Sequence, residues 1–230
     1  MNNVEKAYKY RIYPTKQQEI LIQKTFGCCR FVYNQYLAKR IELYKQNKST
    51  MNYNACSNDL KRLKQEFEWL KEVDSVSIQS SLRDLDIAYQ NFFRRVKQGD
   101  KKAGFPKFKS KKYNKKSYKT KFTNGNIQVL DTKIKLPKLG LVKCKVSKQI
   151  QGRILNATIS QNPSGKYFVS VCCTDVNVPQ YSSTSAVVGI DLGIKEFAIT
   201  SDEQHIENPK YLSKSQKKLA KLQRQLSRKT

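Results

Sequence analysis

The segment AVVGIDLGIKEFAITSD, residues 186–202, places a single carboxylate between an apolar run and a glycine turn. The residues before it, Val187, Val188 and Ile190, predict a buried β-strand, and residues 197–200 predict a second strand. Asp191 would then stand near a strand end, where an oxygen ligand can hold a hard cation. Two-metal phosphodiester cleavage needs several carboxylates around ions about 4 Å apart, so one Asp is only the beginning of such a site.

The charge of the chain indicates the kind of partner. There are 45 Lys and Arg residues against 18 Asp and Glu residues, a net charge of +27, as is typical of proteins that bind polyanions. Nucleic acid is the leading partner and a membrane surface is the competitor. The sequence has no apolar run long enough to span a membrane and no signal-peptide core near its start, so we expect a soluble, intracellular protein.

Cysteine and histidine usage excludes several kinds of catalytic site. The six cysteines include two adjacent pairs but no CxxC spacing, so we expect reduced core thiols rather than a zinc knuckle or redox motif. The single histidine, His205, is expected on a surface loop. One histidine is too few for a His-rich metal site, and the sequence offers no His-based triad. Any catalysis should therefore use carboxylates.

The first hundred residues predict one strand followed by helices. Residues 7–13 alternate, with Tyr8, Tyr10 and Ile12 on one face. The spacing of Thr15 and Gln18 is that of a capping box.

A long helix with apolar residues at helical spacing should follow this cap, bent or split at Gly27. Further helices are expected over about 57–70 and 75–97. Their expected buried faces are Leu60, Leu63, Phe67 and Leu70 in the first, and Ile78, Leu82, Leu85, Tyr89, Phe92 and Val96 in the second.

Residues 101–121 give the best local signal for nucleic-acid binding, with ten lysines, no acidic residue and interleaved aromatic residues. Lysines neutralise phosphates, and aromatic rings offer flat faces to bases. A solvated basic linker is the alternative, but Gly104 and Pro106 favour a shaped loop. The predicted contact residues are Lys101, Lys102, Phe105, Lys107, Phe108, Lys109, Lys111, Lys112, Tyr113, Lys115, Lys116, Tyr118, Lys119 and Lys121.

Residues 122–174 have a β pattern, with a strong turn predicted at the NPSG sequence of residues 162–165. The expected strands cover 127–130, 134–136, 141–146, 154–160 and 167–172. With residues 7–13 they are expected to close a small OB-like barrel into which the helices are inserted. The polar stretch 174–185 predicts a domain boundary.

Residues 211–230 predict a basic amphipathic helix with leucines along one side. Its predicted nucleic-acid contacts are Lys217, Lys218, Lys221 and Arg224. A solvated coiled segment is the alternative.

Five ordered blocks resemble the TnpB (OrfB) proteins of bacterial insertion sequences: AYKYRIYPTKQQ, FGCCRFVYNQYL, GFPKFKSKK, VVGIDLGIKEFAITSD and KKLAKLQRQLSRK. Those proteins are probable transposases, understood as RNA-guided DNA nucleases and similar to type V CRISPR effectors. The resemblance implies guide RNA and target DNA as partners, and a bacterial cytoplasmic location at the nucleoid when DNA is bound. It also implies Mg²⁺ as cofactor and Asp191 as the first catalytic metal ligand.

The resemblance further implies an α+β multidomain fold. It comprises an OB-like wedge barrel with an inserted helical recognition bundle, followed by the start of a ribonuclease-H-like (RuvC) domain. The implied boundaries are 1–14 for the first barrel strand, 15–100 for the recognition helices, 101–121 for the contact segment, 122–176 for the rest of the barrel and 186–230 for the partial nuclease domain.

The sequence departs from the family pattern after the first catalytic aspartate. The later catalytic Glu and Asp and the CxxC…CxxC zinc ribbon are not among these 230 residues. Glu196, Asp202, Glu203 and Glu207 are expected to lie on other faces or at the rim. We therefore expect an incomplete Mg²⁺ site at Asp191, no zinc, and no DNA cleavage by this chain alone.

Two other functions fit parts of the sequence. A non-catalytic RNA- or DNA-binding protein, such as a repressor or an RNA-sequestering derivative, would use the basic segment without chemistry. The GIDLG sequence also fits the first phosphate motif of an actin-like or sugar-kinase ATPase. That ATPase predicts a second glycine-rich phosphate loop and an adenosine motif, which the sequence lacks, and it gives the lysine excess no role.

Overall fold

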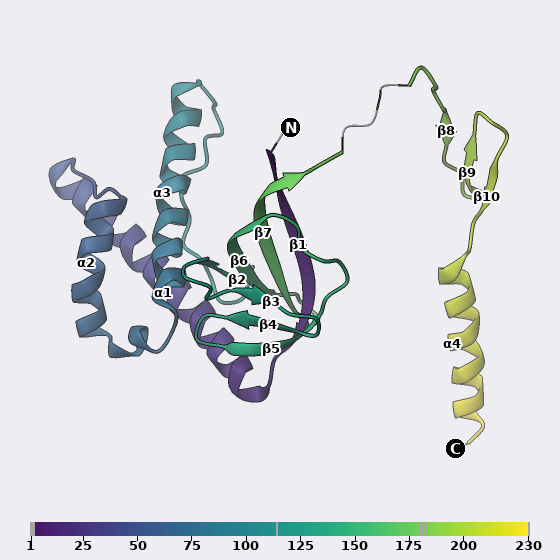
Figure 1. Ribbon diagram of the computed structural model, residues 1–230, viewed down its shortest axis with the longest axis horizontal. Coiled ribbons are helices and arrows are strands. Elements are labelled where there is room, and N and C mark those ends of the chain that lie inside the picture. Colours follow the sequence, from purple (N-terminus) through teal and green to yellow (C-terminus); the bar gives the residue numbers. More distant parts are fainter. Residues whose placement is uncertain (1–2, 114, 180–181, 183, 230) are drawn as a thin grey trace. The chain divides into compact units, whose positions relative to one another are not determined.

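The computed structural model describes residues 3–113, 115–179, 182 and 184–229, and the chain divides into two compact units, Met1–Val178 and Pro179–Thr230. The first unit contains one strand, then helices, then the remaining strands of a sheet (Figure 1). Its elements are β1 (Asn3–Tyr13), α1 (Lys16–Asn47), α2 (Tyr53–Glu66), the 3-10 helix η1 (Glu68–Lys71), α3 (Ser75–Lys97), β2 (Lys116–Lys121), β3 (Gln128–Val129), β4 (Lys133–Leu136), β5 (Gly140–Lys145), β6 (Arg153–Gln161) and β7 (Tyr167–Asn177).

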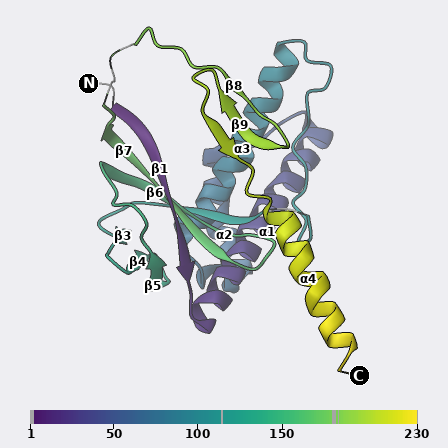
Figure 2. The ribbon, with the colours of Figure 1, turned by 90° about the vertical axis from the view of Figure 1, so that its right-hand side faces the viewer.

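The strands of the first unit form one seven-stranded antiparallel sheet in the order β2-β6-β7-β1-β5-β4-β3. β1 lies in the middle, beside β7 (Figure 2). The edge strands β2 and β3 do not pair with each other in the part of the chain that the structure describes. The sheet therefore stays open where a closed barrel was expected, since β3 is only two residues long and pairs only with β4.

Local interactions set the start of α1 as expected. Thr15 and Gln18 form the predicted capping box, in which each side chain bonds the backbone N–H of the other residue. The helix then runs unbroken from Lys16 to Asn47, so the predicted split at Gly27 is wrong. A helical glycine costs about 1 kcal/mol, and burial of its neighbours Phe26 and Cys28 outweighs that cost.

The other helices differ from expectation mainly at their ends. α2 begins at Tyr53 because Asn52 caps it and accepts a hydrogen bond from the Ala55 N–H. α3 spans the predicted residues, and its expected buried face is correct at Ile78, Leu82, Leu85 and Tyr89. Val96 continues the same spacing but is 51% exposed.

Two hydrophobic clusters share α1. Its N-terminal half, through Ile22 and Phe26, packs on the sheet together with Tyr8, Tyr10 and Ile12 of β1. Its later turns, including Val32 and Leu37, pack against α2 and α3. One continuous helix thus belongs to both cores and holds the helical bundle against the sheet.

The second unit is a small antiparallel sheet followed by a helix. Its strands are β8 (Ile190–Asp191), β9 (Glu196–Thr200) and β10 (His205–Glu207) in the order β10-β9-β8, and the helix is α4 (Tyr211–Ser227). The predicted buried strand before Asp191 is wrong: Val187 is 90% exposed, Val188 51% and Ile190 62%. The reason is that β8 pairs only with β9 and that, among the described residues of this unit, Ala198 is the one buried hydrophobic side chain.

His205 also differs from expectation, because it lies on β10 rather than on a loop. None of the helices in the described ranges is long and apolar enough to cross a membrane.

Candidate nucleic-acid interface

The basic segment that follows α3 is fastened to α1 by one asparagine. The Asn34 amide donates to the Lys109 carbonyl at 2.9 Å, and its oxygen accepts from the Lys109 N–H at 2.8 Å. The Asn34 side chain thus bonds both the N–H and the carbonyl of Lys109, as a neighbouring strand would. These two hydrogen bonds hold residue 109 against the helix. The predicted shaped loop therefore has a specific anchor.

An aromatic contact fixes the beginning of the same segment. The Phe105 ring lies edge-on to Tyr89 and Phe92 of α3, with ring centroids 5.5 and 5.3 Å away. Such packing contributes about 0.5–1.5 kcal/mol per aromatic pair beyond area burial. The Phe105 ring thus acts at least partly as an anchor for the loop.

The Lys109 side chain points its amine inward over an aromatic ring. The Nζ atom lies 4.0 Å from the centre of the Tyr33 ring, a cation–π contact. Burial lowers the pKa of the Lys109 amine, and the nearby Asp84 carboxylate opposes that shift. Asp84 itself has accessible surface but faces a concave wall, and this partial desolvation raises the pKa of its carboxyl.

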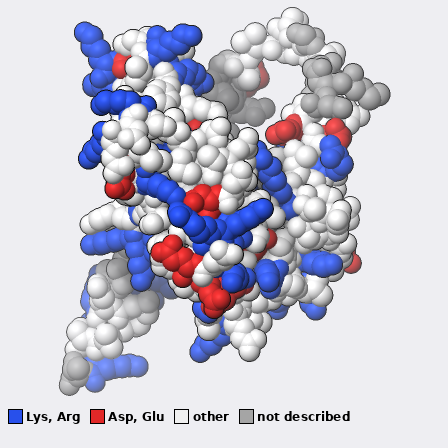
Figure 3. Space-filling view, turned by 90° about the vertical axis from the view of Figure 1, so that its left-hand side faces the viewer, with Lys and Arg blue, Asp and Glu red and all other residues white. Residues whose placement is uncertain are grey.

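A cavity of about 270 Å³ lies between α1, α3 and the start of β2. Cations from three parts of the chain surround it: Arg30 of α1, Lys109 and Lys111 of the loop, and Lys115, Lys116 and Lys119 at or beside β2. On the face of the molecule in Figure 3, Lys and Arg side chains are spread widely around a smaller group of Asp and Glu. The cavity thus brings together cations from α1, the loop and β2.

The strand β2 lies inside the predicted contact segment, and from Tyr118 on its side chains alternate between buried and exposed positions. Lys116, Lys119 and Lys121 are exposed, whereas Tyr118 and Thr120 are buried. The Tyr118 ring packs against Phe26 at a centroid distance of 5.8 Å and offers no free face for stacking. The sequence KSYKTK does alternate lysines with less polar residues from Tyr118 on, as a strand does. Its high lysine content favoured the interpretation as a basic loop instead.

The aromatic residues of the loop are far more exposed. Phe108 is 56% and Tyr113 82% exposed, so both rings are available to a ligand. The remaining predicted lysines of the segment, Lys101, Lys102, Lys107 and Lys112, are also exposed.

The predicted contact residues of α4 are all on the surface. Lys217, Lys218, Lys221 and Arg224 are exposed, and the helix has no buried residue in the described unit. Its leucines, for example Leu212 at 73% and Leu226 at 69%, are exposed as well.

Asp191 occupies the end of β8, opposite Ile199 of β9, which in turn pairs with His205 of β10. His205 Nδ1 lies 2.6 Å from Glu196 Oε2, so the Glu196 carboxylate is engaged by the histidine. Among the residues that the structure describes, no three His, Cys, Asp or Glu side chains gather to hold a metal ion. The Asp191 oxygen suits Mg²⁺ in kind, but one carboxylate does not make a two-metal site.

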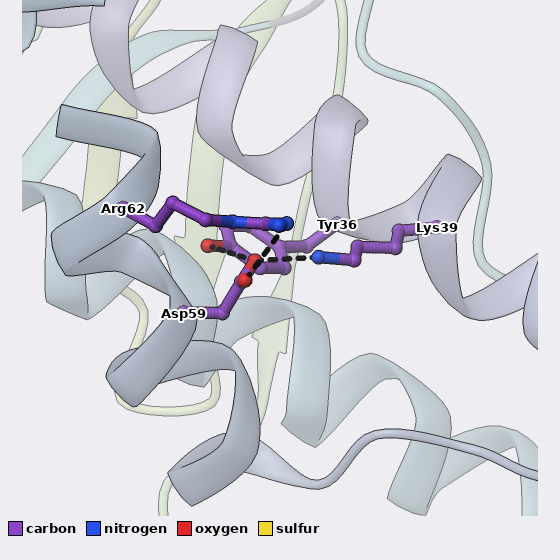
Figure 4. A network of polar contacts seen from close by, with 4 residues as sticks. All are labelled: Tyr36, Lys39, Asp59 and Arg62. Atoms are coloured by element: carbon purple, nitrogen blue, oxygen red, sulfur yellow. Dashed lines mark hydrogen bonds and ion pairs between the residues drawn. The ribbon is translucent and has the colours of Figure 1, made fainter. Parts of the chain in front are cut away.

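A separate polar network joins α1 to α2 (Figure 4). Asp59 accepts from the Tyr36 hydroxyl at 3.1 Å and from Lys39 Nζ at 2.6 Å, and it pairs with Arg62 at 3.1 Å. Burial acts to raise the pKa of Asp59, but the Lys39 hydrogen bond and charge, with Tyr36 and Arg62, lower it overall. This network ties α1 to α2 through the Asp59 carboxylate.

Comparison with known proteins gives matches at both ends of the chain. Residues 1–49 match a family described as "Helix-turn-helix domain", and residues 170–230 match one described as "Probable transposase". In the structure the first of these regions forms β1 and the single helix α1.

Curated relatives include "Putative RNA-guided DNA endonuclease InsQ" of Escherichia coli (strain K12), 37% identical over 97% of this chain and 54% of that protein. A "Putative RNA-guided DNA endonuclease" of Streptomyces pristinaespiralis is 34% identical over 100% of this chain and 56% of that protein. "Virulence protein VsdF" of Salmonella dublin is 31% identical over 46% of this chain and 93% of that protein.

The chain spans about half the length of the two relatives named as endonucleases. A solved Cas12f1–sgRNA–target DNA complex aligns with 97% of this chain and 62% of its own chain, at 17% identity and a TM-score of 0.38. The sequence matches carry the assignment without it. By these relatives and family matches, the chain belongs to the OrfB (TnpB) family of probable transposases.

Proposed function

We propose that this chain supplies the nucleic-acid-binding portion of an RNA-guided DNA endonuclease and that it holds guide RNA and target DNA. The observation that carries the proposal is the basic segment fastened to α1 by Asn34, with exposed lysines around a concave surface. Anchoring reduces the entropy that the segment loses on binding. The names of the curated relatives support the choice of partners.

In this proposal, the open sheet corresponds to the wedge of the family and the α1–α3 bundle to its recognition helices. The segment 101–121 contacts nucleic acid, residues 122–176 complete the wedge, and residues 186–230 belong to a ribonuclease-H-like nuclease domain. The basic face of α4 adds phosphate contacts. Asp191 is the first metal-binding carboxylate of that nuclease domain, with Mg²⁺ as the cation.

Binding should weaken steeply as salt concentration rises. Each phosphate that the protein neutralises contributes about 0.9 to the slope of log affinity against log salt on duplex DNA. We would measure the anisotropy of labelled RNA and duplex DNA with the purified 230-residue chain across a salt series. A flat salt dependence would contradict the proposal.

A pair of triple variants localises the binding surface. Replacing Lys107, Lys111 and Lys112 by alanine should reduce the slope by about 1 for each lysine that neutralises a phosphate. The matched control replaces three exposed lysines of the opposite part of the sheet, Lys133, Lys135 and Lys143, and should leave the slope nearly unchanged. An equal reduction in both variants would show that only net charge matters.

The second test concerns chemistry at Asp191. Since one carboxylate cannot hold both the attacking and the leaving oxygen, we expect the 230 residues to bind without cutting when guide RNA, target DNA and Mg²⁺ are supplied. Gel analysis of end-labelled target DNA measures this directly. Guided cleavage that disappears in Asp191→Ala would overturn the expected lack of cleavage and would establish Asp191 as catalytic.

A further inference from the structure

The cavity between α1, α3 and β2 is not uniformly basic. Asp84, on α3, is the one carboxylate among its lining residues in the described part of the chain. Neither a hydrogen bond nor an ion pair engages this carboxylate among the described residues, although Lys109 and Lys119 attract it from a longer distance. The contrast is Asp86, two residues later, which pairs with Arg40 and accepts from Gln90.

An unpaired carboxylate is unfavourable for a cavity that binds phosphate alone. It repels the phosphate and offsets part of the attraction of the surrounding lysines. Asp84 keeps accessible surface, and its partial burial against the cavity wall raises the pKa of its carboxyl. The group therefore suits a ligand that brings a hydrogen-bond donor.

The floor of the cavity is aromatic. Phe26 and Tyr118 lie there with their rings in contact, and both are almost fully buried. The Tyr118 hydroxyl has no hydrogen-bond partner among the described residues, and it is not one of the polar atoms sealed from solvent. It can therefore bond a ligand inside the cavity.

We propose that this cavity receives one unpaired nucleotide, whose phosphate is held by the rim lysines and whose base donates an exocyclic amino group to Asp84. The inference rests on the proposed function and adds a base preference to it. Carboxylates accept from the N4 amino group of cytosine, and single-stranded nucleic acids present splayed bases to such pockets.

The volume fits this ligand. At about 270 Å³, the cavity lies just below the ~300 Å³ lower end of ordinary small-molecule sites. That space is large enough for a single base. The lysines that surround the opening, among them Lys111, Lys115 and Lys116, come from the loop and β2 and can follow the backbone of the strand on both sides.

The test compares oligonucleotides that differ in the amino group. Labelled oligocytidylate and oligouridylate of equal length have the same backbone charge, and the deoxycytidylate and thymidylate pair repeats the comparison with DNA. We expect the 230-residue chain to bind the cytosine strand about tenfold more tightly at pH 7.5 and constant salt. The sugar series with the larger ratio identifies the strand that occupies the cavity.

Asp84→Ala removes both acceptor oxygens and should reduce this ratio to about one. Because the variant removes a negative charge from a basic cavity, its affinity for oligouridylate should be unchanged or higher. Asp131→Ala, at an exposed position before β4, removes the same charge and the same oxygens elsewhere on the first unit and should keep the tenfold preference. Circular dichroism of both variants verifies the fold.

The outcomes separate this inference from the proposed function. Tight, salt-dependent binding without a cytosine preference, or a preference that survives in Asp84→Ala, would overturn the base contact alone. If neither strand binds, the proposed function fails as well. A preference that disappears only in Asp84→Ala supports the nucleotide site.

Discussion

Alanine at position 152 is expected to lower the free energy of unfolding of the first unit by about 2–5 kcal/mol. Gly152 has a φ of +78°, a left-handed conformation that costs a residue with a Cβ about 1–2 kcal/mol. A Cβ atom there would also collide with the Thr174 carbonyl oxygen and lie 3.0 Å from Val176 Cγ2. Both neighbours belong to β7, so the collision displaces a central strand at a further cost of about 1–3 kcal/mol.

The chain contains a matched control for this substitution. Gly165, in the turn between β6 and β7, also has a φ of +78°, but no atom lies within 4 Å of its added Cβ. Gly165→Ala should therefore cost only the conformational strain, about 1–2 kcal/mol. Urea unfolding followed by the fluorescence of the single tryptophan, Trp69, reports on the first unit. If Gly152→Ala and Gly165→Ala destabilise the protein equally, β7 can move away from the added Cβ atom without a loss of stability.

The second large effect is expected in the helical core. Ile78→Ala should cost about 2–5 kcal/mol, because the side chain is fully buried between α3 and the other helices and its removal leaves a cavity. Val96→Ala on the same helix should change stability by less than about 0.5 kcal/mol, as is usual for an exposed position.

The isoleucine and valine variants give a sharp comparison, since both residues occupy the same predicted stripe of α3. Linear extrapolation of urea curves with a common m-value gives the change in the free energy of unfolding for each variant. A large destabilisation at Val96 would indicate that residue 96 is covered in solution, contrary to the exposed position in the structure.

Local signals made much of the fold predictable. The capping box at Thr15, the NPSG turn and the apolar spacing of α3 each act over a few residues, and all three appear at the predicted positions. The turn is closed by the Asn162 N–H to the Lys166 carbonyl and by the Gly165 N–H to the Asn162 carbonyl. β1 likewise buries Tyr8, Tyr10 and Ile12 on the predicted face.

Only part of the candidate site could be predicted from the sequence. The lysine-rich composition pointed to the segment 101–121, but Arg30, Asn34 and Asp84 come from helices up to about 80 residues earlier and carry no local motif. Their roles depend on which helix face meets β2. The sequence analysis also did not predict β2. The lysines on the exposed face of this strand made the segment resemble a basic loop.

The order of the residues was enough to establish the charge, the secondary structure of α3 and most strands, and the family blocks that led to the OrfB assignment. Three-dimensional packing was needed to establish that Val187 and Val96 are exposed, that Tyr118 is a floor rather than a stacking surface, and that Asp84 faces lysines across a cavity. The two kinds of information differ because capping, turns and periodicity act between near neighbours, whereas burial and charge environment are set by residues distant in the chain.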